Sequence, residues 1–387
     1  MHARSFHLIL LVLFFFLSKE THEQISGMAT SEAASSVLAQ ANEDRYKLVI
    51  APSKMIVQPY AHWSSALAER SRELLALTNS ITASGYRLKT LLSPIAILAK
   101  DPGGYQYRFL SNPTEPEIRT IMDEGFHLFS RYDNGQQCDS YYIGDERGQT
   151  CDYSVIYVYE KPLNSNRKAE RYVVERPDGL VPHPANIMAA EINKKVAEGF
   201  CPVSVISKFE VVLEKISPCE VGKYHSEFAL VREGSDIENK VNVLAKKGYR
   251  VLLADDGIAL LYRNDKTKGI PVAYRWADSE KKDFAAILAK LELAGARYCT
   301  VVSAGSGKRK FLIFESPAQP PARPSEFKTI TIDQLAKIDP ADGMPYLDLT
   351  DESKRNVAEI NKLAAQGFIV RDLFGYKKTQ VLLERTQ

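Results

Sequence analysis

The stretch 360–370, which reads Ile-Asn-Lys-Leu-Ala-Ala-Gln-Gly-Phe-Ile-Val, decides the fold. Ile360, Leu363 and Ala364 recur at helical spacing, so its first half predicts the end of an amphipathic helix. Gly367 supplies the left-handed residue that commonly follows a helix, because glycine adopts this conformation without a Cβ penalty. The apolar residues after the glycine predict a β-strand. The stretch therefore predicts a helix that packs on a sheet.

The same junction occurs six times along the chain of 387 residues. In each case a helical pattern ends at a glycine and a strand pattern follows; the glycines are Gly85, Gly125, Gly199, Gly248, Gly295 and Gly367. The positions seven and four residues before them lie on one helical face, and ten of these twelve residues are apolar. A strand pattern precedes each helix, and a closing strand ends each unit.

The fold class follows from this repeat. We predict an α+β protein of six tandem β-α-β-β repeats, with mixed or antiparallel sheets that carry their helices on one face. A single unit buries little apolar surface, so we expect the units to pack as pseudo-symmetric pairs. The predicted repeats are 44–102, 103–163, 168–217, 222–266, 270–316 and 326–387. Residues 28–43 predict a flexible leader, and the proline-rich residues 317–325 predict a stiff linker.

The first 27 residues predict a signal peptide. An apolar run from Phe6 to Ser18 follows His2 and Arg4, and it is too short to span a membrane, which needs about 20 residues. We therefore expect a periplasmic or secreted protein that does not span the membrane once the signal is removed. If translation starts at Met28, the expected location is the cytoplasm.

The cysteines give modest support to export. Cys138 and Cys151 flank a polar insertion in a predicted hairpin loop, and Cys201 and Cys219 lie near the open end of the next hairpin. Either pair reaches disulfide distance if the flanking strands are antiparallel neighbours, and a bridge over a loop this short is worth roughly 3 kcal/mol. We expect at least one disulfide; the alternative is buried thiols in a reducing compartment. Cys299 begins an apolar strand and predicts a buried free thiol.

The sequence predicts no catalytic residue, no metal ligand and no cofactor, and cofactor-binding residues stay unassigned. The Ala-Gly-Ser-Gly-Lys stretch at 304–308 leads into a strand and lacks the glycine spacing of a phosphate loop, so we interpret it as a hairpin turn. The seven histidines show no metal-ligand spacing. The acidic residues of 339–352 lack the alternating oxygens of a calcium loop, which favours a solvated loop before a helix.

The unit resembles a family of small, uncharacterised bacterial domains whose helix ends Leu-Asn-x-Leu-Ala-x-x-Gly-Trp. The likeness rests on residues 46–49 (Tyr-Lys-Leu-Val), 360–368 and 383–385 (Leu-Glu-Arg). Phe, Tyr or Ala stands where the family prefers Trp. The resemblance covers most of residues 44–387. It implies the strand–helix–strand–strand fold and carries no activity.

These observations lead to three hypotheses about function. A net charge of +2 without a basic stripe argues against nucleic-acid binding. The favoured hypothesis is a non-enzymatic, exported binding or interaction scaffold that contacts a protein partner through the Cys138–Cys151 insertion, because loops often carry function. The first alternative is small-molecule binding at an aromatic site between paired repeats, using tyrosines of the second unit: Tyr105, Tyr107, Tyr141, Tyr142, Tyr157 and Tyr159. An enzyme with a site assembled across repeats is the least favoured.

Overall fold

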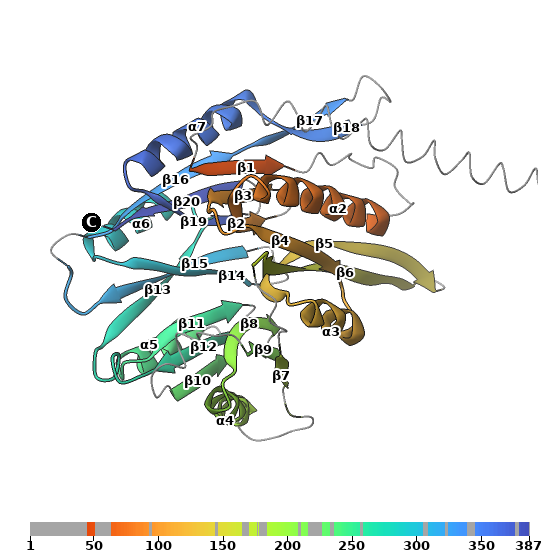
Figure 1. Cartoon of the computed structure of the whole chain (residues 1–387). Coiled ribbons are helices and arrows are strands. Elements are labelled where there is room, and N and C mark those ends of the chain that lie inside the picture. The colour runs from red at the N-terminus through yellow and green to blue at the C-terminus, as the bar shows by residue number, and fades with distance from the viewer. Residues whose placement is uncertain are drawn as a thin grey trace, which may run out of the picture. The chain divides into compact units, whose positions relative to one another are not determined.

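The computed structural model describes residues 45–50, 63–92, 95–143, 146–164, 170–175, 177, 184–207, 210–215, 227–232, 236–255, 258–304, 309–321, 324–338, 345–375 and 379–386 (Figure 1). All of them belong to one compact unit, Arg45–Gln387. The predicted signal peptide and leader lie outside the described residues. Within those residues the chain is an α+β protein with six three-stranded antiparallel sheets and six helices.

Each of the six repeats runs strand, helix, strand, strand. Unit 1 comprises β1 (Tyr46–Ile50), α2 (Trp63–Thr82), β2 (Tyr86–Leu92) and β3 (Ile95–Lys100). Unit 2 comprises β4 (Tyr105–Ser111), α3 (Glu115–Asp123), β5 (His127–Ile143) and β6 (Glu146–Pro162). Unit 3 comprises β7 (Arg171–Glu175), α4 (Pro184–Ala197), β8 (Cys201–Ser207) and β9 (Glu210–Glu214). Unit 4 comprises β10 (Glu227–Arg232), α5 (Ile237–Ala245), β11 (Arg250–Asp255) and β12 (Ile258–Arg263). Unit 5 comprises β13 (Val272–Asp278), α6 (Phe284–Leu293), β14 (Arg297–Ala304) and β15 (Arg309–Pro317). Unit 6 comprises β16 (Glu326–Ile332), α7 (Asp351–Ala365), β19 (Ile369–Phe374) and β20 (Thr379–Arg385), with an additional hairpin of β17 (Gln334–Ile338) and β18 (Pro345–Leu349).

The predicted junctions are confirmed. All six junction glycines have a positive φ, between 65° and 94°, which is the left-handed conformation that glycine adopts cheaply. In unit 6 the N–H of Phe368 donates to the carbonyl of Leu363 at 3.1 Å, as expected for a helix that ends in this way. The residues seven positions before the glycines, from Thr78 to Ile360, are all buried.

The sheets share one strand order. The closing strand of each unit lies in the centre, between the strand before the helix and the strand after it, as in the order β1-β3-β2. Every pairing within these sheets is antiparallel, so the antiparallel form of the prediction holds and mixed pairing does not occur among the described strands. A central strand is flanked on both edges and can be covered on both faces, which explains continuous apolar runs such as Val381, Leu382 and Leu383.

Six hydrophobic cores hold the units together, and each core lies between two successive units. Five of them join units 1 and 2, 2 and 3, 3 and 4, 4 and 5, and 5 and 6. The sixth joins unit 6 to unit 1, with Ile360 and Leu363 of α7 packed with Tyr46 and Leu48 of β1. The units therefore close into a ring, in which each unit has two neighbours.

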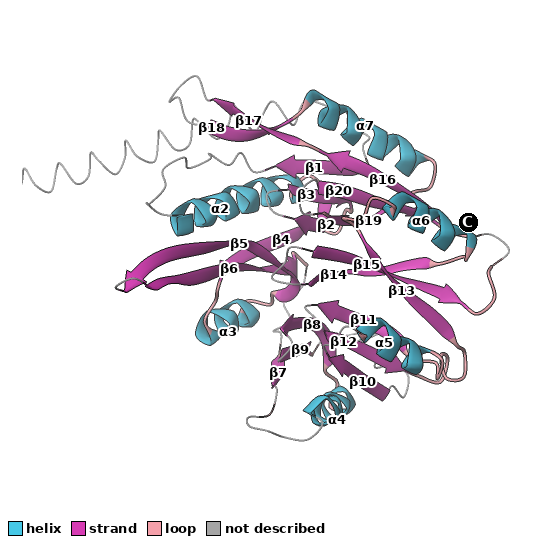
Figure 2. Cartoon of the chain, turned by 180° about the vertical axis from the view of Figure 1, so that it is seen from behind, coloured by secondary structure: helices cyan, strands magenta, loops and turns pink. Residues whose placement is uncertain are grey.

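The expectation of pseudo-symmetric pairs is wrong, because both faces of a sheet are apolar. In β3, Ile95 and Ile97 belong to the core shared with unit 6. Ala96 and Leu98, which alternate with them, belong to the core shared with unit 2. A sheet with two apolar faces needs a neighbour on each side, and a ring provides this for every unit. Figure 2 shows the helices distributed around the strands.

At four of the interfaces, an asparagine of the helix forms hydrogen bonds with the backbone of the next unit. In α7, Asn361 Oδ1 accepts from the N–H of Tyr46 at 2.9 Å, and its Nδ2 donates to the carbonyl of Tyr46 at 3.0 Å. The same two bonds join Asn79 to Tyr107, Asn193 to Phe228 and Asn242 to Tyr274. Between units 5 and 6, Glu292 accepts from the N–H of Phe327 instead. The asparagine thus binds the exposed backbone of the next unit's first strand.

Two segments differ from the sequence prediction. The polar insertion between Cys138 and Cys151 is a continuation of the paired strands β5 and β6 and not a loop. Part of the acidic stretch at 339–352 forms β18, while residues 339–344 lie outside the described residues. The predicted start of the following helix is confirmed, because Thr350 Oγ1 accepts from the N–H of Ser353 at 3.0 Å.

Candidate functional site

The most unusual part of unit 2 is a two-stranded ribbon. β5 and β6 pair along their whole length, from His127↔Glu160 to Ile143↔Glu146. The third strand, β4, pairs with β6 only as far as Ser111↔Ile156. Beyond that point the described residues provide no further strand, and the ribbon extends past the rest of the unit in both views (Figures 1 and 2). Among the described strands, none pairs with either edge of this part of the ribbon, which leaves its backbone groups available for pairing.

The sequence of the ribbon is polar and acidic. Between Tyr132 and Val155 it contains Asp133, Asp139, Asp145, Glu146 and Asp152, against Arg147 as the single basic residue. Four tyrosines also fall in this segment, at 132, 141, 142 and 153. Tyrosine-rich polar surfaces bind protein partners well, because tyrosine offers a large contact area at a small entropic cost.

The predicted cysteine pairs fall in different parts of the structure. Cys138 and Cys151 lie directly opposite each other in the register of the ribbon. Cys201 is buried in β8 and is not a free thiol, but Cys219 lies outside the described residues. Cys299 is free, as predicted, but it is half-buried where the sequence predicts a buried thiol. Burial raises the pKa of its thiol to about 12, which disfavours the reactive thiolate form at neutral pH.

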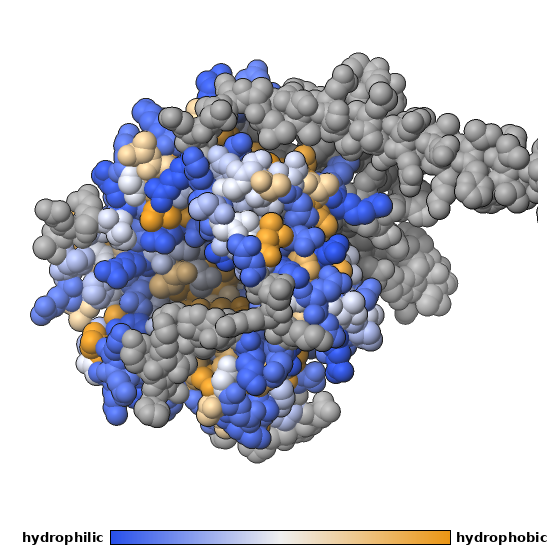
Figure 3. All heavy atoms as spheres, in the orientation of Figure 1, coloured by the Kyte–Doolittle hydropathy of each residue, from blue (hydrophilic) through white to orange (hydrophobic). Residues whose placement is uncertain are grey.

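The strands that follow the helices meet one another around the middle of the ring. β5 contacts β8, β8 contacts β11, β11 contacts β14, β14 contacts β19, and β19 contacts β2. An ion pair even joins two units that are not neighbours, since Arg131 of unit 2 lies 2.8 Å from Asp255 of unit 4. The face drawn in Figure 3 is mostly hydrophilic and is hollowed near its middle.

Each of these inner strands has a β-bulge four residues after its glycine. The bulged residues are Lys89, Phe129, Val203, Leu252, Cys299 and Arg371. A bulge re-aims a side chain and commonly occurs beside functional sites. Only Lys89 and Arg371 of the six are charged, and they belong to the adjacent units 1 and 6.

A half-buried carboxyl group lies beside these two cations. Asp372 Oδ1 accepts from Thr90 Oγ1 at 2.7 Å, and its Oδ2 accepts from the Tyr298 hydroxyl at 2.6 Å. The three residues come from units 6, 1 and 5. Burial raises the pKa of Asp372, and it also raises the pKa of Tyr298 well above its ordinary value. The cluster thus links three units through a carboxyl group with an increased tendency to hold its proton.

A second polar cluster joins units 1 and 2. Arg87 donates to both oxygens of Glu160, at 2.9 Å and 2.7 Å, and Glu160 also accepts from the Tyr107 hydroxyl. That hydroxyl accepts from the N–H of Leu88 at 3.0 Å. Burial is the main cause that raises the pKa of Tyr107. The cluster resembles a catalytic arrangement of arginine, glutamate and tyrosine, but its recurrence in the ring indicates another role.

The equivalent cluster between units 4 and 5 consists of Arg250, Glu315 and Tyr274. The Tyr274 hydroxyl donates to Glu315 at 2.5 Å and accepts from the N–H of Val251 at 2.9 Å, and Arg250 lies 3.4 Å from Glu315. Between units 2 and 3, Glu214 accepts from the N–H of Leu128 at 3.0 Å and contacts His127 at 3.2 Å. An arrangement that occurs at two interfaces, and in part at a third, is best explained as an interface contact.

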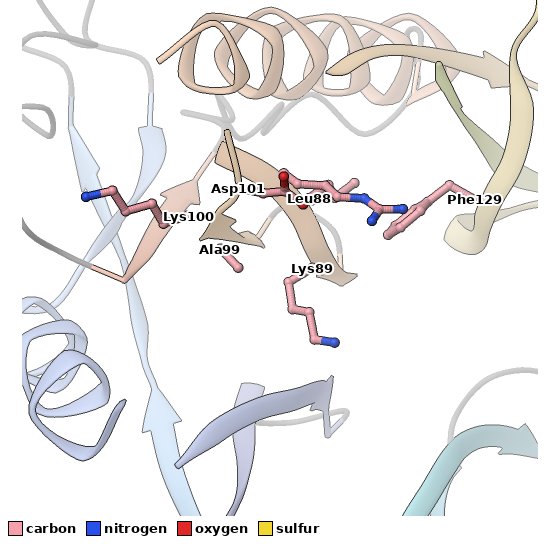
Figure 4. A pocket seen from close by; sticks show the side chains of 7 residues that line it. Leu88, Lys89, Ala99, Lys100, Asp101 and Phe129 are labelled. Carbon is pink, nitrogen blue, oxygen red and sulfur yellow. The ribbon is translucent and has the colours of Figure 1, made fainter. Parts of the chain in front are cut away.

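A cavity of about 300 Å³ lies between β2 and β5. Its lining includes Arg87, Lys89, Lys100, Asp101 and Phe129, so it combines charged side chains with an aromatic ring (Figure 4). Lys89 projects from β2 into the open space, whereas Lys100 points away from it (Figure 4).

No sequence pattern indicated a role for Lys89 or Asp372. Their signal was a charged residue inside a strand, four positions after the junction glycine for Lys89 and five positions after it for Asp372.

Of the six tyrosines of the predicted aromatic site, the side chains of Tyr141 and Tyr142 lie outside those that the structure describes, and Tyr157 is half-buried beside the core of units 2 and 3. Tyr107 and Tyr159 are each 1% exposed and belong to hydrophobic cores. Tyr105 is half-buried beneath the guanidinium of Arg87, at 4.6 Å from the ring centre. Core packing accounts for two of these tyrosines and a cation–π contact for the third.

The other residues that the sequence suggested as candidates do not form a site among the described residues. Within the described side chains no three of His, Cys, Asp or Glu are placed to hold a metal ion. The strands on either side of the glycine-rich residues 305–308 pair at Ala304↔Arg309, and the predicted turn itself lies outside the described residues. Among the helices that the structure describes, none is long and apolar enough to cross a membrane.

Comparison with protein-family models, with curated proteins and with solved structures finds no match to this chain. The resemblance to a family of small bacterial domains therefore stays a prediction, and the function has to be argued from the geometry.

Proposed function

We propose that the protein is a non-enzymatic, exported binding scaffold that holds a protein partner through the β5–β6 ribbon. The observation that carries this proposal is that seven register pairs, from Gln137↔Asp152 to Ile143↔Glu146, continue the ribbon far beyond its last contact with β4. An isolated two-stranded ribbon is marginally stable in water, so a ribbon of this length needs further support. A partner that adds a strand to an open edge would supply it.

The rest of the ring provides a rigid base for this ribbon, which agrees with the proposal. Each unit is fixed by a core on both sides, and the polar clusters at the interfaces are repeated contacts. A catalytic site would require a constellation that departs from the repeat, with a nucleophile, an acid or a base in reach of one another. We further infer that each unit keeps its own helix on one face of its sheet, so that the opposite face receives the helix of the preceding unit.

A disulfide between Cys138 and Cys151 would strengthen the ribbon. Directly opposed residues of antiparallel strands have Cα atoms about 4.5 to 5.5 Å apart, which falls within the range that a disulfide spans. The bridge would hold the ribbon straight in an oxidising compartment, in keeping with export. We also propose a second disulfide, between Cys201 and Cys219, because Cys201 is not a free thiol.

The proposal is tested by shortening the ribbon. Replacing residues 140–149 with Asn-Gly joins Asp139 and Thr150 through a tight hairpin turn and keeps the base of the ribbon. Both forms are immobilised and exposed to extract from the source organism, and each protein retained only by the intact form is purified and titrated against both. We expect one partner to bind the intact protein directly and not the shortened one. An identical set of bound proteins, or equal affinity of the purified partner for both forms, would contradict the proposal.

The control variant keeps the tip of the ribbon polar and at full length. Replacing Asp145 and Glu146 by Asn and Gln leaves the ribbon at full length and removes two of its acidic charges. We expect this variant to retain the partner through backbone pairing, with a slower association if the partner surface is basic. Thermal unfolding of all forms should coincide, because no described core includes residues 140–149.

A further inference from the structure

The asparagine contact between neighbouring units recurs with a period of three interfaces. It is present between units 1 and 2, 3 and 4, 4 and 5, and 6 and 1. Units 2 and 5 cannot make it, because the position six residues before their junction glycine holds Arg119 and Ala289. The order present, absent, present therefore occurs twice around the ring.

A glutamate of the central strand shows the same period. In each sheet, one residue of the central strand pairs with the first-strand residue that occupies the position of Tyr46. Units 2, 3, 5 and 6 have a glutamate there, namely Glu160, Glu214, Glu315 and Glu384. Units 1 and 4 have Ala99 and Tyr262 instead. Because the asparagine and the glutamate lie on different elements, they mark the same period independently.

The ring accordingly divides into two halves of three units each, residues 45–215 and residues 227–386. The halves meet at two interfaces, between units 3 and 4 and between units 6 and 1, which we call the seams. Each seam has an apolar core and the asparagine contact. Units 3 and 4 are consecutive in the chain, whereas units 6 and 1 meet only through contacts.

The two seams differ in one matched pair of groups. Where unit 6 meets unit 1, the Tyr46 hydroxyl accepts from the N–H of Val370 at 3.1 Å. Where unit 3 meets unit 4, the residue that receives the asparagine contact is Phe228, which has no hydroxyl. The residue three positions after the junction glycine, equivalent to Val370, is Pro202 at this seam, and proline has no N–H.

This difference favours the pairing of unlike halves. If units 1–3 paired with a copy of themselves, the Tyr46 hydroxyl would face Pro202 and lack its donor. If units 4–6 paired with a copy of themselves, the N–H of Val370 would face Phe228 and lack its acceptor. A buried polar group without a partner costs free energy, so each mismatch acts against the like pair.

We propose that units 1–3 and units 4–6 are complementary halves, and that each half recognises the other half and not a copy of itself. The partner that fits each half is the opposite half, supplied by the same chain or by a second copy of the chain. The recognition surface is the pair of seams, with Tyr46 and Val370 against Phe228 and Pro202 as the discriminating groups. The proposal does not depend on the ribbon or its partner.

Cleavage of the folded full chain tests the proposal. A protease site is introduced within residues 220–226, which lie outside the described residues and leave Cys201 and Cys219 on the same fragment. After cleavage, native mass spectrometry should find both fragments in one particle with the mass of the uncut chain. Fragments that separate at micromolar concentration would overturn the proposal.

Refolding then lets each half choose its partner. The cleaved protein is unfolded in urea and refolded, and the masses of the particles distinguish like pairs from unlike pairs. Because each like pair contains two mismatches, each worth about one hydrogen bond, we expect unlike pairs to exceed like pairs about tenfold or more. Like pairs in statistical proportion, or fragments that do not reassociate, would overturn the proposal.

Tyr46→Phe separates recognition from folding. It removes the hydroxyl that would face Pro202, so like pairs of units 1–3 should become about tenfold more abundant. Tyr107→Phe is the matched control, because the Tyr107 hydroxyl makes the same contact, with the N–H of Leu88, inside one half. It should leave the proportion of like pairs unchanged. Equal proportions of like pairs for the two variants would contradict the assigned role of Tyr46.

The intact chain gives a second reading that needs no refolding. Phe228→Tyr should lower the melting temperature, although tyrosine stands at this position in three other units, because the new hydroxyl meets Pro202. Adding Pro202→Ala supplies an N–H and should recover part of the loss. An unchanged or raised melting temperature in Phe228→Tyr would contradict the discrimination between the seams.

Discussion

Replacing Asn361 by alanine should destabilise the protein by about 1.5 kcal/mol. The asparagine makes two hydrogen bonds to the backbone of Tyr46, at 2.9 Å and 3.0 Å, and each such bond contributes about 1 kcal/mol. Alanine has a higher helix propensity than asparagine by about 0.5 kcal/mol, which offsets part of the loss. Alanine at position 361 therefore lowers the free energy of unfolding only if unit 6 contacts unit 1.

The assay is urea unfolding followed by circular dichroism, with the free energy extrapolated to water. Hydrogen exchange of the Tyr46 amide gives a local reading, because this N–H donates to Asn361 and should exchange faster in the variant. Asn242→Ala is the matched variant, since Asn242 makes the same two bonds to Tyr274 between units 4 and 5. Its loss should be similar.

The sign of the effect distinguishes a closed ring from an open array. In an open array the side chain of Asn361 would face water at the end of the chain, and alanine would be neutral or stabilising by about 0.5 kcal/mol. A destabilising Asn242→Ala together with a neutral or stabilising Asn361→Ala would refute the reasoning. Equal losses in both variants would support it.

Two further predictions concern single positions. Gly248→Ala should destabilise more than Gly85→Ala: both glycines have a positive φ, which costs alanine about 1 to 2 kcal/mol, but a Cβ at Gly248 would lie 2.3 Å from the carbonyl oxygen of Thr267, whereas none lies within 4 Å at Gly85. Equal melting temperatures for the two variants would contradict this. Asp372→Asn should reduce the loss of stability with rising pH, because a raised pKa means that the folded state retains a proton which the unfolded state has released. The contribution of Asp372 is therefore largest below its ordinary pKa of 3.8 and declines as the pH rises through the raised value, with Lys89, Lys310 and Arg371 as the charged neighbours. Urea midpoints from about pH 4 to about pH 7 measure it against Asp283→Asn, an exposed control, and parallel curves for the wild type and Asp372→Asn would count against the prediction.

The repeat was predictable from sequence because it rests on local rules. A helix face, a left-handed glycine and an apolar strand are each encoded within about ten residues, and Gly367 and its five counterparts show all three. The ring was not predictable in this way, since closure joins residues more than 300 positions apart, such as Tyr46 and Asn361. A signal for it nevertheless exists: an asparagine stands six residues before the glycine in four units, at 79, 193, 242 and 361.

The candidate site was harder to predict than the fold. Lys89 and Arg371 are ordinary charged residues in their own strands, and the analogous position in the other units holds phenylalanine, valine, leucine or cysteine. Only the bulges and the contact between β2 and β19 bring the two cations together. The ribbon was placed correctly as an insertion with opposed cysteines, but its extended conformation was missed because its polar residues also suit a loop.

The central claim, that unit 6 closes onto unit 1, is tested most directly by a disulfide introduced between Thr90→Cys and Asp372→Cys. The side-chain oxygens of these residues are 2.7 Å apart although the residues are 282 positions apart in the chain. After mild oxidation and proteolysis, mass spectrometry should find a peptide that joins positions 90 and 372 within one molecule. The pair Thr90→Cys and Lys240→Cys, in units 1 and 4, which are not neighbours, should give no such link. Free thiols at both 90 and 372, or links only between molecules, would contradict the closed ring.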